Sequence, residues 1–141
     1  MKESSFWKTI RKNLLVVTGN GIKLTRHEDR SAGIPDVSYL YKGVAGWIEI
    51  KYTPSFPVRA TTIVRLYHFK PEQRLFIDTT LKNGGNAFIL WRIGKEIFLF
   101  SGEVQAYLGH STKKELVNIC VNFWHYLDKD FYKELLLNIT S

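Results

Sequence analysis

Glu49 and Lys51 form a charged pair inside an apolar segment that alternates like a β-strand. The side chains of a strand alternate between its two faces, so Ile48 and Ile50 point to one face and the charged pair to the other. Burial of charged side chains is costly unless they pair with each other or bind an ion. The segment therefore predicts a strand with one face in the core and a charged site on the other.

Asp36 is predicted to lie close to this pair. Residues 37–41 and 44–52 have the pattern of two strands joined by a tight turn. Asp36 stands at the start of the first strand, and twelve residues separate it from Glu49. An antiparallel hairpin can therefore bring the two carboxylates together.

These residues favour a metal site. Two carboxylates beside the backbone carbonyl of Ile50 form a hard oxygen site, which suits Mg²⁺ or, as a substitute, Mn²⁺. Such an ion can polarise a phosphoryl group and lower the pKa of a bound water. Lys51 could then orient or deprotonate that water and neutralise charge in the transition state. The competing interpretation is an ordinary hairpin with a Glu–Lys pair on the surface.

The remaining pattern predicts an α/β or α+β fold with a central mixed sheet flanked by helices. Apolar spacing and turn residues indicate a helix to about residue 17, a strand over 22–26, an irregular stretch over 53–69, a helix over 71–83, strands over 87–93 and 96–100, and helical segments around 103–108 and 113–136. We expect a single domain over 1–141, with its core at about 3–100 and a C-terminal helical extension at about 103–141.

The last predicted helix carries an apolar stripe at three- and four-residue steps. Its members are Leu116, Ile119, Cys120, Phe123, Leu127, Phe131 and Leu135. The stripe can pack on the sheet or on a second copy of the chain. The second alternative leads us to expect a homodimer.

Positive charge is concentrated in the half of the chain that contains the candidate site. The formal net charge is +7, and residues 1–70 contain 12 Lys and Arg against 5 Asp and Glu, whereas residues 71–141 contain 8 of each. Surplus positive charge near a site attracts a polyanion and releases counterions on binding. The alternative is that the charge only aids solubility.

The site pattern resembles the PD-(D/E)XK nuclease superfamily, in its compact branch of Holliday-junction resolvases and VRR-NUC-type domains. It is most similar to the small proteins of this kind that bacteriophages encode. The resemblance covers about residues 3–100 and is carried by Arg26-His27-Glu28, Gly33-Ile34-Pro35-Asp36-Val37, Gly46-Trp47-Ile48-Glu49-Ile50-Lys51 and Lys70-Pro71-Glu72-Gln73.

The resemblance implies a restriction-endonuclease-like domain and assigns roles to individual residues. Asp36 and Glu49 match the positions that bind the metal, and Lys51 matches the position that assists the water. Gln73 matches a glutamine that commonly faces the site. Many members have a further acid in the first helix, where this chain has only Glu3, at the extreme start. We expect Glu28 to be the substitute, and the number of metal ions stays open.

Basic and polar residues around the site are candidate DNA contacts. Before the charged strand and after it, these are Arg26, Arg30, Ser31, Arg59, Arg65, His68, Lys70 and Arg74. The second group lies among Tyr52, Phe56 and Tyr67, which could stack on exposed bases. The alternative is a solvated basic loop.

Several other classes are excluded by what the sequence lacks. The four His and one Cys do not have zinc-ligand spacing, so no structural zinc is expected. No dinucleotide fingerprint, Walker loop or nucleophile elbow occurs, so no organic cofactor is expected. The N-terminus lacks the features of a secretory signal, and no apolar run approaches the roughly 18 residues of a membrane span. With a single Cys120, these features indicate a cytoplasmic protein, in a bacterial host cell if the chain is phage-encoded.

The leading expectation is a metal-dependent DNA endonuclease that resolves branched DNA such as Holliday junctions. A chain this short has little room for a domain that reads base sequence, so recognition of shape and backbone is the simpler role. One alternative is a repair or restriction-like nuclease acting on flaps, nicks or ends. Another is a non-catalytic DNA-binding module with a nuclease-like fold.

Overall fold

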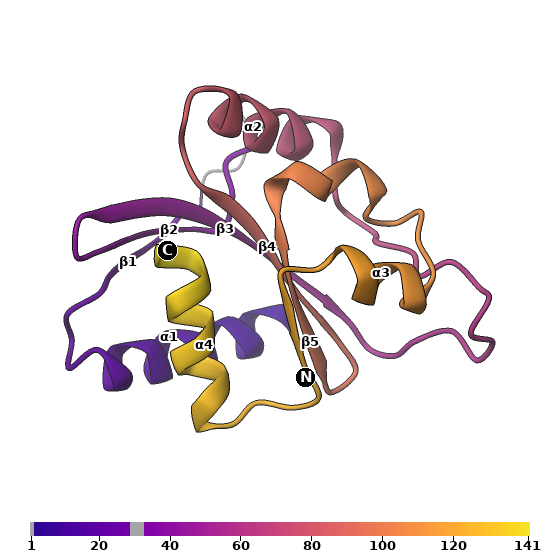
Figure 1. The fold of residues 1–141 in the computed structure, drawn as a ribbon, viewed down its shortest axis with the longest axis horizontal. Helices are drawn as coiled ribbons and strands as arrows, with labels where there is room; N and C mark the ends of the chain where they lie inside the picture. Colours follow the sequence, from indigo (N-terminus) through magenta and orange to yellow (C-terminus); the bar gives the residue numbers. More distant parts are fainter. Residues whose placement is uncertain (1, 29–32) are drawn as a thin grey trace.

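The structure, a computed structural model, describes residues 2–28 and 33–141. In chain order its elements are α1 (Glu3–Val17), β1 (Lys23–Arg26), β2 (Val37–Tyr41), β3 (Val44–Thr53), α2 (Pro71–Lys82), β4 (Ala87–Ile93), β5 (Glu96–Ser101), the 3₁₀ helix η1 (Gly102–Tyr107), α3 (Lys113–Ile119), β6 (Asn122–Trp124) and α4 (Lys129–Thr140) (Figure 1). None of the helices in these ranges is long and apolar enough to cross a bilayer. The predicted α+β fold, with a central mixed sheet flanked by helices, is confirmed.

The strands of the described ranges form one sheet in the order β1-β2-β3-β4-β5-β6. Neighbouring strands are antiparallel except for β3 and β4, which are parallel. A parallel pair needs a long crossover connection. Here the crossover consists of an irregular segment, residues 54–70, followed by α2. We call residues 54–70 the arm.

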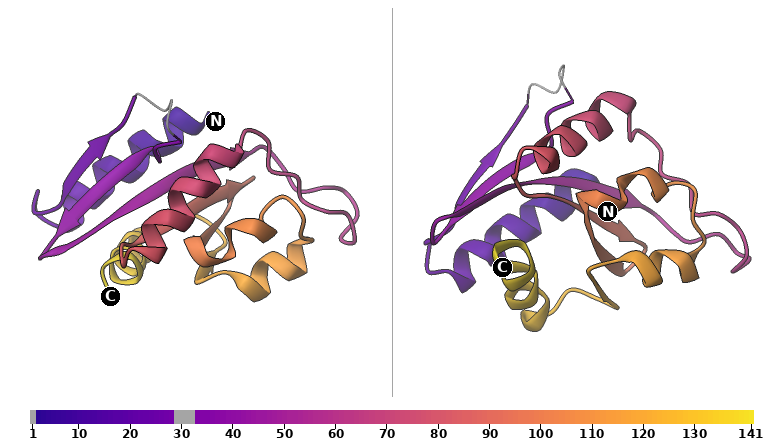
Figure 2. Two further views of the ribbon diagram at one scale, coloured as in Figure 1. Left: turned by 90° about the horizontal axis from the view of Figure 1, so that it is seen from above. Right: turned by 45° about the horizontal axis from the view of Figure 1, so that its top comes forward.

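Helices α1 and α4 cover one face of the sheet (Figure 2). Phe6 and Leu14 from α1 and Phe131 from α4 are fully buried there against Ile48 and Ile50 of β3. This packing uses the apolar face that the alternation of β3 predicts.

Helices α2, α3 and η1 cover the opposite face. Their core residues include Ile77 and Leu116, which pack with Ile89 and Trp91 of β4. Because side chains alternate along β3, the side chains on either side of Ile50 point to this second face. The charged pair of β3 therefore lies on the side of the sheet where the arm and α2 pass.

The prediction of one long helix over residues 113–136 is wrong. The chain forms α3, then the short strand β6, then α4. Strand β6 pairs with β5, with Trp124 opposite Ile97. In this way β6 occupies the edge of the sheet that β5 would otherwise leave unpaired. Asp128 then begins α4, where its Oδ1 accepts the backbone N–H of Phe131 at 2.8 Å. Helical spacing of apolar residues could not reveal that an unpaired edge of β5 takes up the backbone groups of β6.

The apolar stripe is also not an intermolecular surface. Leu116, Phe131 and Leu135 are each 0% exposed within the chain's own core. Tyr39 of β2 donates from its hydroxyl to the carbonyl of Ile139 at 2.5 Å, and burial raises the pKa of Tyr39. The C-terminal segment is therefore part of the sheet and its cover, not a helical extension, and the stripe no longer supports a homodimer.

Removal of one buried leucine of α4 is expected to destabilise the whole fold. Leu135→Ala should lower the free energy of unfolding by about 2–5 kcal/mol, because it leaves a cavity against the sheet. Leu137 lies on the same helix but is 69% exposed. Leu137→Ala should therefore change the free energy of unfolding by less than about 0.5 kcal/mol. Urea denaturation of both variants checks this, and similar losses in the two would contradict the packing of α4.

Candidate active site

Glu49 and Lys51 are buried charges on the same face of β3. Glu49 is 0% exposed and Lys51 is 4% exposed. The Lys51 Nζ lies 3.7 Å from Glu49 Oε1 and donates to the backbone carbonyl of His68 at 2.9 Å. The pair is therefore not the surface ion pair of the competing interpretation.

Asp36 joins them from the neighbouring strand. Val37 of β2 lies opposite Ile48 of β3, so one further step in the register places Asp36 opposite Glu49. Directly opposed residues of an antiparallel pair point to the same face. Asp36 is 0% exposed, and its Oδ2 accepts the backbone N–H of Ile50 at 2.7 Å. The hairpin brings the two carboxylates together as the sequence predicts.

The Ile50 carbonyl faces the edge at which β2 ends. Within a strand, the N–H and C=O of one residue point to the same side, and the N–H of Ile50 points to Asp36. If the ladder continued, Pro35 would be the partner of Ile50, but proline has no N–H to donate. The sequence thus ends the ladder at the point where the carbonyl and the two carboxylates meet.

Two cations near the carboxylates, Arg26 and Lys51, form loose ion pairs with them. Arg26 Nη2 lies 3.9 Å from Asp36 Oδ1, and its side chain is 30% exposed. This distance and the 3.7 Å between Lys51 and Glu49 both exceed the roughly 2.7–2.9 Å of a direct charged hydrogen bond. The arrangement keeps cations close to the carboxylates without a tight contact in either pair.

The donor set fits a hard divalent cation. Two buried carboxylates and a backbone carbonyl lie where the β2–β3 ladder ends. They are oxygen ligands of the kind that Mg²⁺ and Mn²⁺ prefer. Among the residues that the structure describes, no group of three or more His, Cys, Asp or Glu side chains could hold a metal ion. The ligands of an ion at the end of this ladder would therefore be Asp36, Glu49, the Ile50 carbonyl and water.

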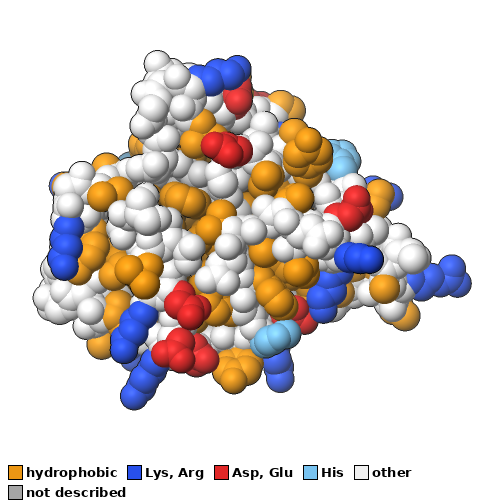
Figure 3. Space-filling model, viewed as in Figure 1, with side chains coloured by type: hydrophobic (Ala, Val, Ile, Leu, Met, Phe, Trp, Pro, Cys, Tyr) orange, Lys and Arg blue, Asp and Glu red, His pale blue; other side chains and the backbone are white. Residues whose placement is uncertain are grey.

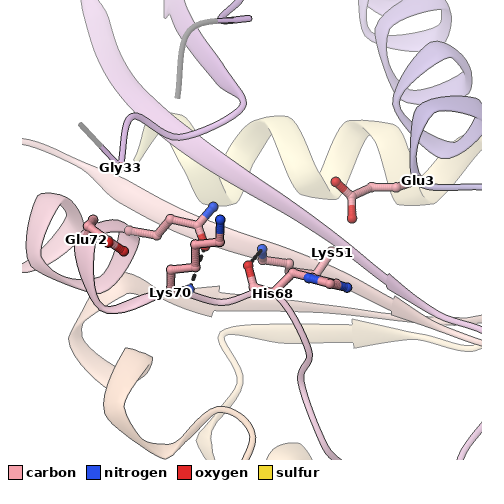
Figure 4. A pocket seen from close by; sticks show the side chains of 7 residues that line it. Glu3, Gly33, Lys51, His68, Lys70 and Glu72 are labelled. Atoms are coloured by element: carbon pink, nitrogen blue, oxygen red, sulfur yellow. Dashed lines mark hydrogen bonds between the residues drawn. The ribbon is translucent and has the colours of Figure 1, made fainter. Parts of the chain in front are cut away.

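A pocket of about 480 Å³ opens beside Lys51 (Figure 4). Its walls come from the start of α1, the loop before β2, β3, the end of the arm and the start of α2. The lining residues are Glu3, Gly33, Lys51, His68, Lys70, Glu72 and Gln73. The Lys51 side chain therefore connects the buried carboxylates to a space that a ligand can enter.

Glu3 and Glu28 lie in different surroundings. Glu3 projects from the start of α1 towards the pocket that Lys51 lines (Figure 4). Glu28 is exposed and does not line this pocket. The structure thus brings Glu3 to the pocket, although the expected extra acid is Glu28.

Gln73 also reaches the pocket. It is 6% exposed, and its Oε1 accepts the backbone N–H of Lys70 at 2.8 Å, at the start of α2. This hydrogen bond fixes the side chain and leaves its amide nitrogen as the group available to a ligand.

The predicted DNA contacts divide into several groups. His68 and Lys70 line the pocket, whereas Arg59 and Arg65 are exposed on the arm. Lys and Arg side chains occupy the projecting tip of the molecule formed by this segment (Figure 3). Arg26 lies beside Asp36, with which it forms the loose ion pair. Two further candidates, Arg30 and Ser31, lie outside the described residues.

Arg74 is held within the fold. Its guanidinium donates to the backbone carbonyls of Gln105 and, at 2.8 Å, Leu108, and it lies 4.2 Å from the ring centroid of Phe69. Burial lowers the pKa of Arg74. These contacts tie α2 to η1, so the structure directs Arg74 away from the pocket.

Phe69 and Gly33 are site residues that the sequence does not single out. The Lys51 Nζ lies 5.2 Å from the ring centroid of Phe69, which is 8% exposed. Gly33 has a φ of +72° and packs against the backbone of Glu72. An isolated aromatic residue such as Phe69 has no recognisable pattern in the sequence. For Gly33, the only indication in the sequence is its place in Gly33-Ile34-Pro35, directly before Asp36.

Comparisons with solved structures find a likeness, whereas the other comparisons find nothing. No protein-family model matches the chain, and no curated protein matches it. Among solved structures, the chain is similar to Hjc, a Holliday junction resolvase from the archaeal hyperthermophile Archaeoglobus fulgidus. The two share 15% sequence identity, the alignment covers 69% of this chain and 76% of that chain, and the TM-score is 0.45.

Proposed function

We propose that this protein is a metal-dependent DNA endonuclease that hydrolyses phosphodiester bonds. The observation that carries the proposal is the position of Asp36 and Glu49. Both are fully buried and lie opposite each other where the β2–β3 ladder ends, next to a buried Lys51. Buried carboxylates would repel a DNA backbone unless a cation lay between them. A protein that only binds DNA has no need of this arrangement.

Asp36, Glu49 and the Ile50 carbonyl would hold Mg²⁺, or Mn²⁺ as a substitute. When bound, the ion supplies Lewis-acid polarisation of the phosphate and lowers the pKa of a water molecule. Lys51 would orient that water and balance negative charge in the transition state. The His68 carbonyl, which accepts a hydrogen bond from Lys51 Nζ, keeps the ammonium directed at the pocket.

Three further residues have supporting roles in the proposal. The Gln73 amide would donate to a phosphate oxygen, since its side chain lines the pocket at the start of α2. Glu3 is a candidate extra acid, because it lines the pocket with Lys51. Glu28 stays a candidate second metal ligand by resemblance alone.

The arm and its surroundings would contact the DNA backbone. No acidic residue occurs from Ile50 to Pro71, a stretch that contains Arg59, Arg65 and Lys70. Positive charge without nearby acids favours phosphate contacts whose strength falls as salt rises. Such contacts position a duplex without reading its sequence.

Branched DNA, such as a Holliday junction, is the favoured substrate within this proposal. Within this proposal the arm supplies phosphate contacts, which do not read base sequence, so DNA shape is the property that the protein can best recognise. A four-way junction has two strands to cut, so a homodimer with two sites would suit the task. Flaps, nicks and ends are the alternative substrates.

Cleavage of a labelled four-way junction tests the proposal. Wild type should cut it in Mg²⁺ and not in EDTA, and Lys51→Ala should cut about 10²–10⁴-fold more slowly, because it removes the group that assists the water. Lys95 is exposed in the turn between β4 and β5, so Lys95→Ala is the matched control and should cut normally. Thermal melting verifies that each variant is folded.

Linear duplex, flap and single-stranded substrates separate the alternatives. Metal-dependent cutting of these alone would keep the nuclease and reject the junction. Tight DNA binding with no cutting of any substrate would reject the enzyme and leave a DNA-binding module.

A further inference from the structure

The Lys51 ammonium is enclosed, so its position depends on the groups that replace water around it. With 4% exposure it has lost most of its hydration, which is costly for a charged group. Its Nζ lies 2.9 Å from the His68 carbonyl oxygen, 3.7 Å from Glu49 Oε1 and 5.2 Å from the centroid of the Phe69 ring. Two of these three groups are consecutive residues of the arm.

The backbone at the end of the arm is shaped to present both groups. His68 has a φ of +63°, a left-handed conformation that residues other than glycine rarely adopt. This turn lets the carbonyl of His68 and the side chain of Phe69 face the same ammonium. A local cost of this kind persists only where surrounding contacts enforce it.

The ring of Phe69 is itself fixed by a second cation. The Cζ of Arg74 lies 4.2 Å from its centroid, and the Arg74 guanidinium is held by the carbonyls of Gln105 and Leu108. The face of an aromatic ring carries negative electrostatic potential, so it attracts both cations. Contacts thus run from η1 through Arg74 and Phe69 to Lys51.

We propose that Phe69 is a positioning residue for Lys51, holding the ammonium at the pocket through the face of its ring. This inference rests on the proposed nuclease function, because it assigns to Phe69 a part in the reaction that Lys51 assists. The ring of Phe69 should hold the Lys51 ammonium in place whether or not the protein cuts DNA.

Kinetics of Phe69 variants test the role in the reaction. Phe69→Leu keeps an apolar side chain but removes the ring, and kcat should fall about tenfold with KM unchanged, the effect of one lost cation–π contact. Phe69→Tyr keeps the ring and should restore most of kcat. Phe76 is an aromatic residue of α2 that contacts Trp47, and no Lys or Arg of residues 2–28 and 33–141 lies over its ring, so Phe76→Leu is the matched control.

Chemical labelling tests the position of Lys51 without relying on cleavage. Lys51 should react slowly with an amine-acylating reagent in wild type, Phe69→Tyr and Phe76→Leu, and several times faster in Phe69→Leu, as peptide mass spectrometry can measure. If no variant cuts DNA but labelling follows this pattern, the proposed function fails while the positioning of Lys51 stands.

Three results would overturn the inference. The first is unchanged labelling and kcat in Phe69→Leu. The second is faster labelling with kcat unchanged, which would remove Phe69 from the reaction. The third is an equal loss of kcat in the Leu and Tyr variants together with lower melting temperatures, which would reduce Phe69 to a packing residue.

Discussion

The Asp36→Asn variant is expected to remain folded and bind DNA, but to cleave it on the order of 10³-fold more slowly than wild type. Asparagine has the shape of aspartate, and its side-chain oxygen can still accept the N–H of Ile50, a hydrogen bond of 2.7 Å in the structure. What it loses is the negative charge that a divalent cation needs. Single-turnover cleavage of the junction at saturating Mg²⁺ measures the effect.

Asp78→Asn is the matched control for this substitution. Asp78 lies on α2, where its carboxylate pairs with Lys82 at 2.8 Å on the surface, so the same chemical change should leave the rate unaltered. Binding of Mn²⁺ by each purified protein, followed by calorimetry, provides a second measurement, and Asp36→Asn should weaken it at least tenfold. Normal cleavage by Asp36→Asn would remove Asp36 from the site.

The Gly33→Ala variant is expected to lose both stability and cleavage. A Cβ at Gly33 would lie 2.2 Å from the carbonyl oxygen and 2.4 Å from the carbonyl carbon of Glu72, and the φ of +72° disfavours any other residue. Backbone atoms cannot rotate away as a flexible side chain can, so the start of α2 and the segment that contains Gly33 must move apart. We expect a loss of about 2 kcal/mol or more in the free energy of unfolding.

The displaced helix start carries Lys70 and Gln73, which line the pocket. Cleavage by Gly33→Ala should therefore fall by about 10²-fold under conditions in which the variant remains folded, since misplacement by about 1 Å has this effect. Urea denaturation and single-turnover cleavage measure the two losses.

Gly43→Ala separates steric contact from backbone strain. Gly43 has a φ of +82°, but no atom lies within 4 Å of a Cβ built there. Its alanine variant should lose about 1 kcal/mol and retain normal cleavage. Equal effects in the two variants would mean that strain alone explains Gly33→Ala, and that the contact with α2 is unimportant.

Most of the elements could be predicted because their signals are local. The alternation of β3, the glycines after α1 and α2, and the tight turns between neighbouring strands depend on residues a few positions apart. The approach of Asp36 to Glu49 could also be predicted, because a two-stranded hairpin fixes which residues are opposed once the turn is known.

The C-terminal third could not be predicted in the same way. Phe123 fits a helical stripe, yet it lies in β6 because the edge of β5 offers backbone partners. That edge is distant in the sequence, so no local pattern can reveal it. For the same reason the stripe suggested an interface, whereas Phe131 and Leu135 are used within the chain.

The chemical content of the candidate site was determined by the sequence itself: two carboxylates and a lysine on one face of a hairpin, set by the two-residue period of a strand. Only the tertiary structure decided what surrounds them. It brought Glu3 rather than Glu28 to the pocket, turned Arg74 towards η1, and placed Phe69 beneath Lys51. The physical reason is that hairpin geometry follows from neighbouring residues, whereas the walls of a pocket come from segments brought together only when the sheet and its covering helices pack.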